Sequence, residues 1–462
     1  MNEKDIDHRT RILKGWKSLG YGSGVIGHLA PLNFINSILV IFYGYAIGLD
    51  MLWVNLGAAV GVLTNALATP IFGYLSDVKK PGKWGKRKPF LLLGLPFMII
   101  FNIILWFSPR ASHFGEANFI IISFLFISMF LFHVGYSMVR SPYLALLPEI
   151  STDSENRVKV ASIQGVFGII AIVIAILLPL LLQSMLIAPD DIYVTPSDVN
   201  LLYTVLPVLG VFFGIITVVF TLFPYFSADE NYCEVESCEA PKIGLGGVMK
   251  EIFKPFKDTE YRKFLLSAFF VNAGLRLITK MLGPYFSYVL DFQGMIFTIF
   301  MVMVFPFAVI GFLLWSRRAK TKGLKKTYLQ STLILSIFLA STFFLLFEIS
   351  IQVIQVMAYI IVSGALFTMV TGFIVPNPII SEMVDNAPEA FKKQAKEGTL
   401  SGSYFGTYTL MINLGYVVAD LIIGMMLAGE RAENGYFIGL LFPIGAVLYF
   451  LAVIVFWNAK IK

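Results

Sequence analysis

The chain has 462 residues, of which 57% are hydrophobic and only 14% are charged. A soluble domain carries about 25% charged residues, so this composition excludes a water-soluble fold. The apolar residues come in long runs, and a transmembrane helix needs about 20 of them. We therefore predict an all-α integral membrane protein with twelve transmembrane helices.

In chain order, the apolar runs are separated by short charged segments that mark the expected ends of the spans. Several runs exceed 25 residues, a length that helix tilt accommodates. The predicted spans are 21–48, 52–75, 89–108, 118–147, 159–185, 200–225, 263–290, 294–316, 327–348, 353–381, 399–428 and 435–457.

The basic residues predict the orientation, because cytoplasmic loops carry an excess of Lys and Arg. If the N-terminus is cytoplasmic, 30 of the 35 Lys and Arg fall in cytoplasmic segments, and only Arg110 and Arg431 fall in outer loops. We therefore expect a multi-pass protein of the plasma membrane with both termini in the cytoplasm. The net charge of +6 then reflects topology, and we expect no nucleic-acid partner.

One long polar segment divides the spans into two sets of six. We expect an N-terminal six-helix bundle at 1–226, a cytoplasmic loop at 227–262 and a C-terminal six-helix bundle at 263–462. The loop holds both cysteines, Cys233 and Cys238. We interpret them as free thiols, because no histidine stands nearby to complete a metal site.

The two halves resemble each other in sequence. A shift of 238 residues places Gly73 on Gly311 and Gly85 on Gly323, within matching basic loops. A shift of 236 residues places Pro142 of the fourth span on Pro378 of the tenth. This pattern indicates parallel repeats, as in the major facilitator architecture.

Four runs carry a resemblance to a known family. They are Pro70–Asp77 (PIFGYLSD), Trp84–Gly94 (WGKRKPFLLLG), Tyr21–Gly24 (YGSG) and Ser141–Glu149 (SPYLALLPE). Together they resemble the glycoside–pentoside–hexuronide:cation symporters, such as melibiose permease. The resemblance implies a major facilitator fold of two pseudo-symmetric bundles and secondary active transport by alternating access.

The chain departs from this family at the positions that carry acidic residues for sugar and cation on spans 1, 2 and 4. These positions are occupied by Leu29, Asn65, Thr69 and Arg140. Tyr136 and Ser137 match the family's polar pair on span 4. A site without carboxylates loses most of its affinity for a hard cation, so we do not expect sodium coupling. Coupling to protons through Asp420 or His28 stays open.

Four charged residues lie at membrane depth, where each costs about 2.5–3.5 kcal/mol. They are Arg140, Arg276, Lys280 and Asp420. Lys280 and Asp420 lie at similar depth on their spans, so we predict that they pair. Arg140 and Arg276 are then left over from opposite halves, and two guanidiniums suit a carboxylate or phosphate. The structural alternative is that all four pair or snorkel to the interface.

Further residues are candidates by type and position. Side chains that suit hydrogen bonding or stacking of a hydroxylated solute, and equally suit helix packing, are Asn33, Asn36, Tyr136, Tyr143, Tyr404, Tyr408 and Asn413. Candidates for coupling or charge pairing, besides Asp420 and Lys280, are His28, Asn65, Thr69 and Ser137. Asp77 ends the second span before a basic loop, and the expected cytoplasmic gate is Asp77, Lys86, Arg87, Arg317 and Arg318.

These features predict a secondary transporter, working as a monomer in the bilayer, for a small polar organic solute. The solute is a sugar, glycoside or sugar acid, with an anionic one favoured by the arginines. Because the chain has no Gly-rich nucleotide loop and no catalytic constellation, we expect neither an enzyme nor a cofactor. Two alternatives stay open, a carrier of lysolipids or other amphiphiles and a non-transporting membrane sensor on the same fold.

Overall fold

The computed structural model describes most of the chain between residues 12 and 460. The parts left out are 1–11, 81, 83, 111–112, 114–116, 152, 186–195, 231–245, 248–252, 291, 293, 348–349, 389–398 and 461–462. The two cysteines, predicted to be free thiols, lie outside the described residues. All regular elements in the described ranges are helices.

The N-terminal half consists of six long helices. They are α1 (Trp16–Val40, continued by the π-helical turn Ile41–Ala46), α2 (Met51–Val78), α3 (Lys88–Ile104), α4 (Phe119–Ile150), α5 (Ser154–Met185) and α6 (Pro196–Ser227). Asp50 and Asn118 cap α2 and α4, because each side chain accepts a hydrogen bond from a first-turn amide.

The C-terminal half begins after a short 3-10 turn at Lys254–Lys257. Its elements are α8 (Thr259–Tyr288), α9 (Gly294–Lys322), α10 (Leu324–Ser341, with a 3-10 turn at Thr342–Leu346), α11 (Ile351–Met369), α12 (Thr371–Ile374), α13 (Pro376–Asp385), α15 (Thr399–Met426), a 3-10 turn at Gly429–Glu433 and α16 (Gly435–Trp457).

Eleven of the described helical segments are long and apolar enough to cross a membrane, and α3 is a shorter apolar helix of 17 residues. The all-α membrane fold is therefore confirmed. The tenth span, predicted at 353–381, is found as one apolar membrane-spanning segment, Gln352–Asp385. Within this segment the helix is interrupted at Val370 and Val375, which divides it into α11, α12 and α13, and Pro376 begins α13.

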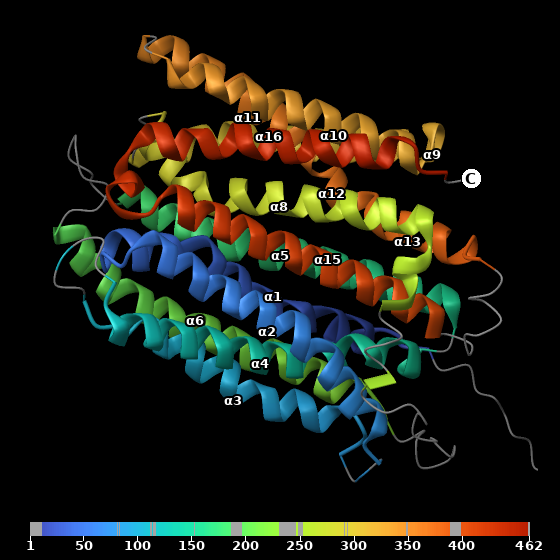
Figure 1. Ribbon diagram of the computed structural model, residues 1–462. Helices are drawn as coiled ribbons and strands as arrows, with labels where there is room; N and C mark the ends of the chain where they lie inside the picture. The colour runs from blue at the N-terminus through green and yellow to red at the C-terminus, as the bar shows by residue number, and fades with distance from the viewer. Residues whose placement is uncertain are drawn as a thin grey trace, which may run out of the picture.

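The helices run roughly parallel to one another, with α1–α4 and α6 on one side of the molecule, α8–α13 and α16 on the other, and α5 and α15 in the middle (Figure 1). Helix α3 lies at the outer edge of the first group, and α9 and α11 lie at the outer edge of the second. Helix α1 packs against α5 and α6, and α8 packs against α16. Across the middle, α2 packs against α15, so these two helices bring the halves together.

Equivalent glycines of the two predicted repeats adopt the same unusual conformation. Gly85 before α3 has a φ of 80° and Gly323 before α10 has a φ of 87°. Both values lie in the left-handed region that favours glycine. A Cβ on Gly73 of α2 would meet α4, and one on Gly311 of α9 would meet α11. The matched glycines therefore occupy matched places in the two halves.

We call the end of the bundle that holds segments 79–87 and 317–323 the basic end, and the opposite end the far end. The two halves are hydrogen-bonded to each other toward the far end. Tyr45 Oη donates to the Ala432 carbonyl at 2.8 Å, and the Gly429 amide donates to Asp50 Oδ2 at 2.7 Å. These contacts hold the far end closed in this structure.

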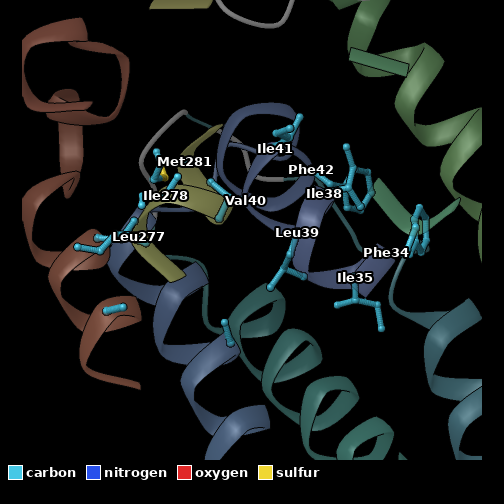
Figure 2. Close-up of a cluster of buried hydrophobic side chains, with 14 of the residues drawn as sticks. Phe34, Ile35, Ile38, Leu39, Val40, Ile41, Phe42, Leu277, Ile278 and Met281 are labelled. Carbon is cyan, nitrogen blue, oxygen red and sulfur yellow. The ribbon is translucent and has the colours of Figure 1, made fainter. Parts of the chain in front are cut away.

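An apolar contact accompanies them. Figure 2 shows Val40 at the end of α1 beside Ile278 and Met281 of α8, all of them buried. Leu39 and Ile38 continue the cluster along α1. Because a hydrophobic contact between bundles excludes water, this cluster separates the middle of the protein from the far end.

Candidate solute-binding and coupling site

Three charged residues meet at the interface between the helices of the C-terminal half. The Asp420 carboxylate on α15 accepts from Arg276 Nε at 3.0 Å and Nη2 at 3.2 Å, and from Lys280 Nζ at 2.9 Å. Asp420 is fully buried, and the two cations are almost fully buried. We call these three residues the charged triad. The predicted pairing of Lys280 with Asp420 is confirmed.

The expectation that Arg276 is left unpaired was wrong, because it shares the same carboxylate. Arg276 and Lys280 are four residues apart on α8 and therefore lie on one face. Two buried like charges on one face need an anion between them, and Asp420 is placed there by α15. The triad keeps a formal charge of +1.

Arg140 on α4 is the membrane-depth cation that no described side-chain carboxylate pairs with. Its guanidinium lies 5.7 Å from the centre of the Tyr136 ring, and that of Arg276 lies 5.4 Å from the centre of the Tyr416 ring. Tyr416 interacts electrostatically with both guanidiniums. Each half therefore presents an arginine on a tyrosine face, and Tyr416 is under the influence of both arginines.

The polar residues at the family's cation positions form a network of their own. Asn65 Oδ1 accepts from Thr69 Oγ1 at 2.9 Å and from Ser137 Oγ at 3.0 Å. Thr69 and Ser137 are 3.4 Å apart. These side chains hydrogen-bond to one another, so the network links α2 to α4. It presents only neutral oxygens to a ligand.

Several candidate residues serve helix packing in this structure. Tyr143 donates to the Tyr21 carbonyl and accepts from Gln164 Nε2, both at 2.8 Å. Asn33 donates to the Leu29 carbonyl of its own helix. Tyr21 also donates back to the Tyr143 carbonyl, so the family-like motifs on spans 1 and 4 bind each other.

Two candidate tyrosines lie in the apolar cluster at the basic end of the C-terminal half. Tyr404 donates to Asp258 Oδ2 at 2.8 Å, and its ring centre lies 4.3 Å from that of Tyr261. Tyr408 stacks on Phe264 with ring centres 5.7 Å apart. These contacts place both tyrosines away from the charged triad.

The remaining candidates lie closer to the middle of the bundle. His28 is buried, with its ring centre 5.9 Å from that of Tyr136, and interacts electrostatically with Arg140. Asn36 is half-buried on α1. Asn413 is buried, and its amide nitrogen has no hydrogen-bond partner in the described parts of the chain. Asn413 precedes Tyr416 and Asp420 at helical spacing and shares their face of α15.

The residues expected to form a cytoplasmic gate make their observed contacts within each half. The backbone amides of Lys86 and Arg87 donate to the Glu230 carboxylate, and Arg87 Nη1 donates to Ser76 Oγ at 3.0 Å. Arg318 Nε donates to Gln330 Oε1 at 2.8 Å. Arg317 is exposed, and the side chain of Asp77 lies outside the described residues. The gate stays a prediction.

Nearly the whole chain matches one protein family. Residues 20–461 match the family described as MFS/sugar transport protein. The chain belongs to this family.

Curated relatives of this family member are named as symporters. An uncharacterized symporter of Synechocystis sp. is 27% identical over 168 residues, which cover 36% of this chain and 30% of the relative. The inner membrane symporter YicJ of Escherichia coli is 25% identical over a match that covers 33% of this chain and 32% of the relative. The lactose permease of Lactobacillus helveticus is 28% identical over a match that covers 34% of this chain and 26% of the relative. The matched segments thus span about a third of each relative or less.

Solved structures share the fold. The xylose transporter XylE from E. coli, in an inward open conformation, superimposes with a TM-score of 0.60 at 14% identity, covering 96% of this chain and 94% of that one. The nucleoside transporter NupG gives a TM-score of 0.60 at 13% identity, with coverage of 96% and 99%. These likenesses confirm the major facilitator architecture of this family member.

Two residues at the centre of this MFS protein were not predicted from the sequence as site residues. Asn55 of α2 accepts from Lys280 Nζ at 2.7 Å, and Tyr416 lies against Arg276 and interacts electrostatically with Arg140. Tyr416 stands one turn before Asp420, so helical spacing from the lone deep carboxylate could have found it. Nothing in the sequence pairs Asn55 with a lysine 225 positions away.

Proposed function

We propose that this protein is a secondary active transporter that moves a small organic solute carrying one anionic group, such as a sugar acid or hexuronide. Alternating access between the two halves moves the solute, and the far-end contacts described above belong to the state that opens toward the basic end. The solute binds at Tyr416, between the Arg140–Tyr136 pair and the Arg276–Tyr416 pair.

The observation that carries this proposal is the charge count at the centre of the bundle. Arg276 and Lys280 share one described carboxylate, and the half-buried Arg140 has no acidic partner among described side chains. A cation at membrane depth is costly unless it is paired, so an anion is the chemistry that completes this site. The unpartnered amide nitrogen of Asn413 suits a solute hydroxyl as its acceptor.

The proposed placement in the membrane rests on the distribution of Lys and Arg. The basic end carries the Lys- and Arg-rich loops and faces the cytoplasm, with both termini on that side of the plasma membrane. The Asn65, Thr69 and Ser137 network supplies neutral oxygens only, and hard cations bind through carboxylates. Transport therefore does not depend on sodium.

Uptake by proteoliposomes tests the proposal. The purified protein is reconstituted and offered neutral glycosides, sugar acids and lysolipids, with sodium present or replaced by choline and with the pH varied. We expect sugar acids to accumulate, at rates that sodium leaves unchanged. Uptake of neutral glycosides alone, or exchange of lysolipids alone, contradicts an anionic solute, and the absence of any uptake favours a non-transporting role.

A further inference from the structure

The charged triad holds one cation too many. Lys280 faces Asp420 from α15, Asn55 from α2 and Arg276 from its own helix, and Tyr416 of α15 lies beside Arg276. His133 of α4 interacts electrostatically with Arg276 and Asp420. One carboxylate therefore serves two buried cations, and removing one positive charge would leave a neutral Arg276–Asp420 pair.

Only one change of protonation achieves this neutrality. An arginine stays protonated at any physiological pH, and a proton added to Asp420 would raise the charge of the triad and break both ion pairs. Loss of a proton from Lys280 leaves the two-point Arg276–Asp420 contact intact. We propose that Lys280 is the proton-coupling residue, which releases its proton from the empty carrier and binds it again together with the anionic solute.

The proton balance is simple and rests on the anionic solute of the proposed function. When the carrier empties, the Nζ–H bond breaks, the electron pair stays on nitrogen and the proton passes to water on the open side. With Lys280 neutral, Arg140, Arg276 and Asp420 sum to +1. A bound monovalent anion and a protonated Lys280 restore the same sum. Loaded and empty carriers then have equal charge, and one proton accompanies each anion.

The same proton controls a contact between the halves. Lys280 Nζ on α8 donates to Asn55 Oδ1 on α2 at 2.7 Å. Gly424 of α15 lies against Asn55, since a Cβ added to this glycine would stand 3.2 Å from the Asn55 Cβ. A charged donor makes a hydrogen bond about twice as strong as a neutral one. Protonated Lys280 therefore stabilises far-end closure, and neutral Lys280 weakens it.

A measurement without solute tests this link. Both native cysteines are replaced by serine, and Phe119→Cys on α4 and Tyr436→Cys on α16, both exposed at the far end, carry spin labels. We expect the distance between labels to lengthen as the pH rises from about 6 to about 10, a range that covers lysines removed from water. Lys280→Gln should give the long distance and Lys280→Arg the short one, each without pH response.

The matched control is Lys263→Gln on the same helix, because Lys263 pairs with Glu260 away from the triad. This control should keep the wild-type pH response. A pH response that persists in both Lys280 variants overturns the proposal, since His28 or His133 would then carry it. Because Lys280→Gln and Lys280→Arg are expected to give opposite distances, either variant tests the proposal if the other does not fold.

A second measurement uses D-glucuronate as the probe in weakly buffered solution with a pH-indicator dye. Wild-type protein should take up about one proton for each glucuronate bound, by linkage, and Lys280→Gln should bind glucuronate without proton uptake. If glucuronate does not bind but the label response depends on Lys280, the proton role stands and the solute class is wrong. If glucuronate is transported and Lys280→Gln still takes up protons, the solute class stands and the proton role is wrong.

Discussion

At the scale of single residues, the protein stabilises two buried cations by pairing both of them with one carboxylate. Asp420 accepts three hydrogen bonds from two cations, and all three side chains are buried. Removing one member of a buried ion pair leaves an uncompensated charge, which costs about 3–5 kcal/mol. Asp420 has the largest effect of the three, because two cations depend on it.

Asp420→Asn should therefore lower the free energy of unfolding by about 3–5 kcal/mol, measured by denaturation of the purified protein in detergent. Adding Lys280→Gln to Asp420→Asn should recover part of this loss, since one unpaired cation is then removed. The matched control is Glu260→Gln, which breaks a half-exposed pair with Lys263 and should cost less than about 1 kcal/mol. Equal losses for Asp420→Asn and Glu260→Gln would show that the triad is not buried from solvent.

Sequence reasoning reached part of this site. The depth of Lys280 and Asp420 along their helices predicts their pairing, because helical rise is regular. The second partner, Arg276, was not predicted. Its contact with Asp420 depends on the conformation of the long arginine side chain, which the position of a residue along its helix does not determine. Tyr143 and Tyr404 look like sugar-stacking residues by type, yet the structure uses their hydroxyls for hydrogen bonds between helices.

At the scale of helices, close approach depends on glycines at the crossing points. A Cβ on Gly311 of α9 would overlap the backbone carbonyl of Phe367 on α11, whereas a Cβ on Gly165 of α5 would meet nothing within 4 Å. Backbone cannot move aside as a flexible side chain can. The α9–α11 contact thus requires glycine at position 311, and α5 does not require it at position 165.

Gly311→Ala should lower the free energy of unfolding by about 1–3 kcal/mol, the usual cost of overpacking. Gly165→Ala should leave stability unchanged or raise it by up to about 1 kcal/mol, because alanine is the better helix former. Denaturation of both variants in the same detergent measures the difference. A stable Gly311→Ala beside an unchanged Gly165→Ala would mean that α9 and α11 are farther apart than this structure shows.

The helices themselves were predictable because apolar runs between charged loops determine where a chain crosses a membrane. The ends of the helices and the breaks within them were harder to predict. The tenth span divides into α11, α12 and α13, with Pro376 at the start of α13, and hydropathy alone does not detect this division. The matching glycines before α3 and α10 were found from the sequence shift, and the structure gives both a positive φ.

At the scale of the whole molecule, two groups of helices meet along α2 and α15 and are joined at the far end. The proposed topology, which rests on the distribution of Lys and Arg, has the basic end in the cytoplasm. A membrane-impermeant maleimide applied to intact cells should label Phe119→Cys at the far end and leave Lys320→Cys at the basic end unlabelled, in a background without native cysteines. Both positions are exposed, so the reverse labelling pattern would invert the predicted topology.

The central claim is that the arginines at the middle of the bundle select an anionic solute, and one comparison tests it most directly. Initial uptake rates of D-glucuronate and D-glucose are measured in parallel for wild-type and Arg140→Gln proteoliposomes, with Arg140→Lys as the charge-conserving control. A charge-assisted hydrogen bond contributes about 1.5–3 kcal/mol, so Arg140→Gln should slow glucuronate uptake by about 10- to 100-fold. Arg140→Lys should retain a larger share of it. Wild-type protein that prefers glucose, or Arg140→Gln protein that takes up glucuronate at the wild-type rate, would contradict the account.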